Sequence, residues 1–166
     1  FIVALLSAIS VIIVMLFEPS LYNLARPGDY YIAGLCTKYI MGISFFAFAL
    51  TVVREIVKDI QDIEGDRKFN AKTLPVKYGV GSAKLIAQLF LVLTIGGLLY
   101  LNFTVFNIFG NVYLIYILAL VAFLLFIGVR IFTAGTKKEY GLISNLLKIS
   151  MLVGLGILPL YYLLEF

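Results

Sequence analysis

The 166-residue chain has no histidine and only one cysteine, Cys36. Without histidine it can form neither a Ser–His–Asp nor a Cys–His nucleophilic centre, and it offers no imidazole to a metal ion. A single cysteine excludes a disulfide within the chain and is too little for a cysteine-based metal site. Any metal that these residues bind must be held by oxygen atoms, which favours Mg²⁺, Mn²⁺ or Ca²⁺.

Charged residues are also scarce: they make up 13% of the chain, whereas hydrophobic residues make up 63%. Soluble domains usually carry about 25% charged and roughly 45–50% apolar residues. The composition therefore predicts an integral membrane protein. The net charge of +4 is ordinary for such a protein and gives no reason to expect a nucleic-acid partner.

Five apolar segments follow one another along the chain, and they cover residues 1–17, 31–53, 83–101, 112–132 and 142–164. Apolar runs of about 20 residues can cross a bilayer core of about 30 Å as helices. We predict an all-α fold, a polytopic transmembrane bundle of five helices, in one domain over residues 1–166. The chain begins at Phe1 without the basic region and cleavage site of a signal peptide, so we expect that an N-terminal part is missing.

Lysine and arginine are distributed unevenly between the connections, which alternate between the two sides of the membrane when there are five helices. The breaks after the second and fourth segments, with their flanks, hold 11 of the 13 basic residues, and the other side holds Arg26 and Lys38. Basic residues concentrate in cytoplasmic loops. We therefore expect a protein of the cytoplasmic membrane in which the break after the second segment faces the cytoplasm.

The most charged part of the chain directly follows the second apolar segment. Nine of the fifteen residues in REIVKDIQDIEGDRK, residues 54–68, are charged. At about 100° per residue, a continuing helix would place Glu55, Asp59, Asp62 and Asp66 in one stripe. Gly65 weakens this expectation, because glycine costs about 1 kcal/mol inside a helix.

Carboxylates aligned on one helix face repel each other and need a positively charged partner. Nearby lysines and arginines are one such partner, and the segment would then be a solvated loop of mixed charge. A divalent cation is the other, since Mg²⁺ is usually held by one or two protein carboxylates with phosphate oxygens completing its octahedron. Aspartates mixed with basic residues suit a metal-bound diphosphate. The pattern by itself leaves both interpretations open.

The sequence KDIQDIEGDRKFNAKTLPVKYG, residues 58–79, resembles the second aspartate-rich motif of the UbiA family of intramembrane prenyltransferases. That motif has the form D-x-x-D-x-x-x-D, followed by a basic residue with threonine and then by P-V-x-x-G. DIEGD and TLPV are most similar to the archaeal-type geranylgeranylglyceryl phosphate prenyltransferase branch. Eight positions match the motif: Asp59, Asp62, Asp66, Lys72, Thr73, Pro75, Val76 and Gly79.

The resemblance implies a place for the chain within a larger fold. Members of the family usually have nine membrane helices, with aspartate motifs after the second and sixth. The five predicted helices would be helices five to nine, and residues 1–166 would be the C-terminal part of one prenyltransferase domain. The family's first motif, N-D-x-x-D, does not occur in this chain, and we expect it upstream of Phe1. We therefore expect the 166 residues alone to be inactive, because half of the metal site would be missing.

The activity that the resemblance implies is Mg²⁺-dependent transfer of an isoprenyl group from an allylic prenyl diphosphate, within the lipid membrane. The hydrophobic acceptor would be an aromatic ring or a lipid glycerol phosphate. Among the catalytic residues, Asp62 and Asp66 would be metal ligands, and Asp59 would be a third ligand or would orient them. Residues 73–79 would shape the loop. The expected diphosphate-binding residues are Lys72, Arg67 and Lys58.

Two other functions remain as alternatives. A CDP-alcohol phosphotransferase also places aspartates beneath membrane helices, but its D-G-x-x-A-R pattern is absent from DIEGDRKFN. A transporter or ion-binding protein should have polar groups deep within its helices, and the centres of these segments have almost none. Asn145 and Lys148 start the last segment on the aspartate side, either as contacts to a substrate headgroup or as ordinary polarity at a helix end. The sequence names neither the acceptor nor the prenyl length.

Overall fold

The computed structural model describes residues 2–16, 27–104 and 111–156, and all regular secondary structure within these ranges is helical. The five long helices are α1 (Ile2–Leu16), α2 (Pro27–Gln61), α4 (Leu74–Thr104), α5 (Asn111–Thr133) and α6 (Lys137–Leu155). The predicted all-α bundle is confirmed, and a short additional helix, α3 (Ile63–Lys68), lies between α2 and α4. The outer ends of the first and last predicted segments lie outside the described residues.

Three of the helices are long and apolar enough to cross a membrane within the described ranges: Ile40–Gln61 in α2, Leu74–Thr104, and Val112–Thr133. At about 1.5 Å per residue, α2 with its 35 residues extends over about 52 Å. This is longer than a hydrocarbon core of about 30 Å. The charged residues near the C-terminal end of α2 can therefore reach the membrane surface while the apolar part of the helix spans the core.

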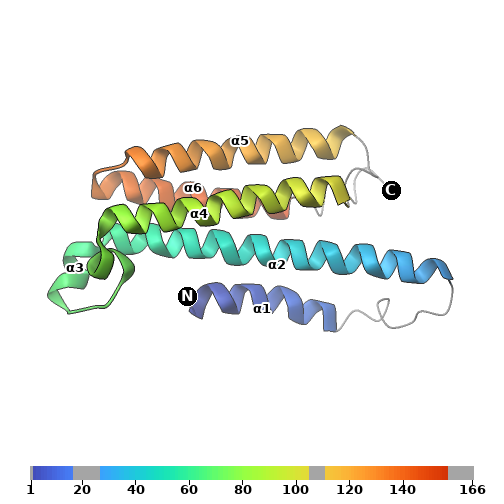
Figure 1. Ribbon diagram of the computed structural model, residues 1–166, viewed down its shortest axis with the longest axis horizontal. Helices are drawn as coiled ribbons and strands as arrows, with labels where there is room; N and C mark the ends of the chain where they lie inside the picture. Colours follow the sequence, from blue (N-terminus) through green and yellow to red (C-terminus); the bar gives the residue numbers. More distant parts are fainter. Residues whose placement is uncertain (1, 17–26, 105–110, 157–166) are drawn as a thin grey trace.

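Helix α2 is the centre of the bundle and packs against α1, α4 and α6, while α5 packs against α4 and α6 (Figure 1). Successive long helices run in opposite directions (Figure 1). The α2–α4 connection, which contains the aspartates, and the α5–α6 connection therefore lie at the same end of the molecule. This is the arrangement expected from the alternation of the connections along the sequence.

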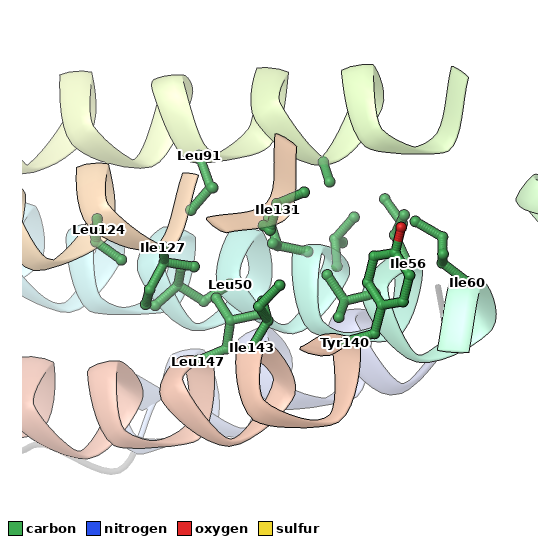
Figure 2. Packing of buried hydrophobic residues seen from close by; sticks show 14 of the residues in the cluster. Leu50, Ile56, Ile60, Leu91, Leu124, Ile127, Ile131, Tyr140, Ile143 and Leu147 are labelled. Carbon is green, nitrogen blue, oxygen red and sulfur yellow. The ribbon is translucent and has the colours of Figure 1, made fainter. Parts of the chain in front are cut away.

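Apolar side chains of α2, α4, α5 and α6 form most of the core beneath that end and point into the space between these helices (Figure 2). Lipid tails are as apolar as these side chains, so close van der Waals contact holds membrane helices together more than removal from water does. Close approach of α6 to α2 depends on Gly154, where a Cβ atom would collide with the ring of Phe46. The labelled core residues are Leu50, Ile56 and Ile60 of α2, Leu91 of α4, Leu124, Ile127 and Ile131 of α5, and Tyr140, Ile143 and Leu147 of α6.

Candidate functional site

Helix α2 ends one residue before Asp62, and this bends the predicted stripe of carboxylates. Asp62 has φ −104° and ψ 14°, and α3 begins at the next residue. Helical hydrogen bonds nevertheless continue across the bend, because the Asp62 N–H donates to the Lys58 carbonyl at 2.9 Å and the Asp66 N–H donates to the Asp62 carbonyl at 3.0 Å. The expectation of one straight helix through Asp66 is therefore only partly met.

The carboxylates are still gathered closely enough to repel one another. The Asp59 carboxylate loses solvation through partial burial and, to a smaller extent, is repelled by Asp66, Glu55 and Asp62. Asp59 and Asp66 are partly buried, whereas Asp62 is exposed. In the described parts of the chain, no three Asp, Glu, Cys or His side chains lie close enough to hold a metal ion between them. The assignment of Asp59, Asp62 and Asp66 as metal ligands thus remains a prediction, for a site that other oxygen atoms must complete.

Thr73 orients the carboxylate of Asp66. Its hydroxyl donates a hydrogen bond to Oδ2 of Asp66 at 3.0 Å. The chain folds back to make this contact through Asn70, whose φ of 53° lies in the left-handed region that asparagine tolerates better than most residues. The backbone closes the same turn, because the Ala71 N–H donates to the Asp66 carbonyl at 2.9 Å. The sequence indicated Thr73 only as part of a loop, and its hydrogen bond to Asp66 was not predicted.

The residues after Thr73 redirect the chain into the bundle. Pro75 is buried in the first turn of α4, where a proline is tolerated because the N–H groups of that turn have no partner within the helix. Gly79 then adopts φ 87° and ψ 159°, a conformation that only glycine reaches easily, and α4 bends there. The matched P-V-x-x-G sequence therefore sets the direction of α4 relative to residues 54–68. We call these residues, which include Asp59, Asp62 and Asp66, the aspartate segment.

The three basic residues predicted to bind diphosphate are all exposed, but they belong to different surfaces. Arg67 lies in the last turn of α3, and Lys72 lies in the segment between α3 and α4. Lys58 lies on α2 and lines a groove shared with α6. Arg67 and Lys72 do not line this groove. The diphosphate contacts of all three residues remain a prediction.

The groove that includes Lys58 runs between the end of α2 and the start of α6 and has a volume of about 640 Å³. It adjoins the aspartate segment, because Nζ of Lys137 lies 3.1 Å from Oδ1 of Asp62. Both Asn145 and Lys148 line it, so the structure brings these two residues to the same surface as Lys58. We call this surface the lysine groove, and its lining residues are Lys58, Gln61, Lys137, Lys138, Gly141, Leu142, Ser144, Asn145 and Lys148.

The start of α6 is fixed by a capping box formed by Thr136 and Glu139. The Glu139 N–H donates to Oγ1 of Thr136, while Oε2 of Glu139 accepts from the N–H groups of Gly135 and Thr136 at 2.9 Å each. These backbone hydrogen bonds from Gly135 and Thr136 are the main causes that lower the pKa of Glu139 to about 2. The T-x-x-E sequence before an apolar run was the signal for this box.

The turn before α6 is also tied to the bundle. The Tyr140 hydroxyl donates to the Ala134 carbonyl at 2.9 Å, and Nζ of Lys84 donates to the same carbonyl at 2.6 Å. These bonds join α4 and α6 to the end of α5. Helix α6, which forms one wall of the lysine groove, is therefore held at its start by several hydrogen bonds.

Comparison with known proteins identifies relatives of this chain. The chain is 39% identical over 127 residues to a digeranylgeranylglyceryl phosphate synthase of Methanosphaera stadtmanae, covering 72% of this chain and 44% of that protein. It is 32% identical over 109 residues to the synthase of the same name from Methanothermobacter thermautotrophicus, covering 66% of this chain and 38% of that protein. The chain thus spans less than half the length of these relatives. No solved structure matches it significantly.

The family itself is established by a match over most of the chain. Residues 11–152 match the UbiA prenyltransferase family, and this range includes the aspartate segment, the Thr73 contact and the lysine groove. The match confirms the family expected from the aspartate motif, and the relatives agree with the archaeal-type branch. The chain therefore belongs to the UbiA prenyltransferase family and is an integral membrane protein.

Proposed function

We propose that this chain forms the C-terminal part of a membrane enzyme that transfers an isoprenyl group from a prenyl diphosphate to a lipid glycerol phosphate. The names of the relatives from Methanosphaera and Methanothermobacter favour a glycerol phosphate acceptor over an aromatic ring. The N-D-x-x-D motif would come from a part of the protein outside these 166 residues. Basic residues concentrate at the end of the bundle that contains the aspartate segment. Because such residues are typical of cytoplasmic loops, the aspartate segment would face the cytoplasm.

The observation that carries this proposal is the fixed orientation of Asp66 within the matched motif. Thr73 donates to one carboxylate oxygen, Oδ2. A carboxylate offers two oxygens and about four lone-pair sites, so Asp66 keeps the capacity to bind a cation while it is held in place. A side chain whose orientation is set by a neighbouring hydroxyl in this way is typical of a metal ligand with a supporting contact.

The residues of the aspartate segment fit Mg²⁺. Their carboxylates offer oxygen atoms as ligands. A bound cation would also reduce the repulsion between Asp59 and the neighbouring carboxylates. Asp62 and Asp66 would hold the ion, with Asp59 as a third ligand or as the residue that orients them. Because no three such groups in the described residues converge, phosphate oxygens and the first aspartate motif would complete the coordination.

When bound, Mg²⁺ would neutralise the diphosphate and help it to leave the allylic carbon. Arg67 and Lys72 would bind the remaining negative charge of the diphosphate, and Lys58 was predicted from the sequence to assist them. The apolar helices below would receive the prenyl chain and keep water away from the reacting carbon. The chain's own side chains would thus position the donor and balance its charge.

The proposal is tested by replacing Asp66 with Asn in the full-length protein and measuring diphosphate release from geranylgeranyl diphosphate in the presence of a glycerol phosphate lipid. Asn keeps the size of the side chain and removes its charge. We expect activity to fall by at least about 100-fold, since a charge that acts on the leaving group is lost. Asp62→Asn should behave in the same way.

Glu64→Gln is the matched control. Glu64 is an exposed carboxylate in the same short helix, and it lies outside the predicted stripe. We expect this variant to keep nearly normal activity. Near-normal rates for Asp66→Asn would contradict the metal-ligand assignment. A protein that releases cytidine monophosphate from a CDP-alcohol, or that turns over no substrate while it moves an ion, would contradict the prenyltransferase assignment.

A further inference from the structure

The lysine groove is built for an anion rather than for a metal. Four of its lining residues are lysines, and none is acidic. One of the four, Lys137, is paired with Asp62 at its edge. The lining therefore carries a concentrated positive charge without a carboxylate that could hold Mg²⁺.

Neutral donors complete the positive lining. Gln61 and Asn145 each offer an amide NH₂, and Ser144, which is 4% exposed, offers a hydroxyl. Amides, a hydroxyl and ammonium groups together match the several oxygen atoms of a phosphate.

One face of α6 passes from polar to apolar along its length. Lys138, Asn145 and Lys148 lie within about 80° of one another on the helix. Exposed apolar side chains share this face: Leu142 is 52% exposed, Ile149 is 49% exposed and Leu152 is 70% exposed. A ligand with a charged head and an apolar tail could therefore place its head among the lysines and its tail along α6.

We propose that the lysine groove binds the phosphate monoester of the lipid acceptor. This inference rests on the proposed function, because it assigns the second substrate of that reaction. The donor's diphosphate needs a metal, and the carboxylates for that metal lie in the aspartate segment. A phosphate monoester without a metal suits a surface that has lysines and no acid. The contact between Lys137 and Asp62 joins the two surfaces, as a reaction between two bound substrates requires.

The test replaces Lys138 and Lys148, singly and together, by alanine in the full-length protein. Both side chains are exposed, so their loss leaves the packing of the bundle intact. We expect the KM for the glycerol phosphate lipid to rise roughly 10-fold for each lysine, as the loss of a charge-assisted hydrogen bond predicts. The KM for geranylgeranyl diphosphate and kcat at saturating acceptor should stay within about twofold, because these lysines do not contact the donor.

Lys77→Ala is the matched control, since Lys77 is an exposed lysine of α4 that does not line the groove. It should leave the KM for the glycerol phosphate lipid unchanged. An unaltered acceptor KM in the Lys138 and Lys148 variants of an active enzyme would overturn the inference. A loss that occurs only in vesicles containing phosphatidylglycerol, and not in neutral detergent, would also overturn it, because the lysines would then bind bulk anionic lipid.

A binding measurement separates failure of this inference from failure of the proposed function. Soluble glycerol phosphate should raise the thermal unfolding temperature of the unaltered full-length protein and should not raise that of the double variant. If the unaltered protein transfers no prenyl group, the proposed function fails, and this shift still decides whether the groove binds a phosphate monoester. Equal shifts in both proteins would show that it does not.

Discussion

The two connections at the aspartate end of the bundle use their carboxylates in opposite ways. In the α5–α6 connection, Glu139 accepts hydrogen bonds from two backbone N–H groups and from the Thr136 hydroxyl. In the α2–α4 connection, Asp66 receives a side-chain hydrogen bond from Thr73, and exposed Asp62 makes an ion pair with Lys137. One carboxylate closes a turn, whereas the other two keep oxygen atoms for a further ligand.

This difference shows that a charged connection between membrane helices does not by itself indicate a metal-binding site. Glu139 lies among lysines just as the aspartates do, yet its hydrogen bonds serve the start of α6. The carboxylate of Asp59, by contrast, is repelled by three other carboxylates. This clustering of carboxylates is the reason why we predict that the α2–α4 connection binds a cation.

Removing the Thr73 hydroxyl should have the largest effect on activity, because Asp66 would lose the hydrogen bond that orients its carboxylate. We expect Thr73→Val to lower kcat/KM of the full-length enzyme roughly 10–100-fold, the usual effect of losing a contact that supports a metal ligand. Thr73→Ser keeps the hydroxyl and should retain most of the activity. The measurement is prenyl transfer at several Mg²⁺ concentrations, and unaltered Mg²⁺ dependence in Thr73→Val would show that Asp66 needs no support.

Low pH should weaken the α5–α6 connection, in which Glu139 caps α6. The pKa of Glu139 in the folded protein is about 2, below its ordinary value of 4.5. A lowered pKa stabilises the fold at pH values above 4.5, and this contribution is lost as the pH falls from about 4.5 towards 2. Glu139→Gln cannot ionise, so the difference in thermal unfolding temperature between the unaltered protein and this variant should shrink across that window. A constant difference between pH 6 and pH 2 would contradict the capping role.

The smallest effect is expected from the ion pair that joins the two connections. The side chains of Lys137 and Asp62 are 72% and 55% exposed, so water screens their attraction. Lys137→Ala should lower the free energy of unfolding by no more than about 0.5 kcal/mol, as is usual for exposed pairs. Denaturant unfolding in detergent checks this value. A loss well above 1 kcal/mol would mean that the pair holds α6 to the aspartate segment.

The features that could be predicted from the sequence are those that depend on residues close together in the chain. The apolar segments were identified because a bilayer demands long runs of apolar residues, and the aspartate motif was identified because its spacing lies within about twenty residues. Asn145 and Lys148 were noted as polar residues at a helix start. Their meeting with Lys58 could not be predicted, because it depends on how α6 packs beside α2. The bend at Asp62 was likewise missed, although Gly65 had weakened the expectation of a straight helix.

The sequence by itself predicted the membrane location and the helical fold, contained the motif by which the family was recognised, and limited any metal ligands among these residues to oxygen atoms. These properties follow from composition and from spacing within single segments, which no distant contact can alter. Only the tertiary structure decided that Thr73 orients Asp66, that Glu139 closes a turn, and that lysines from α2 and α6 share one groove. Each of these depends on a chain reversal or on the packing of two helices, so the physical cause lies in contacts between residues that the sequence keeps apart.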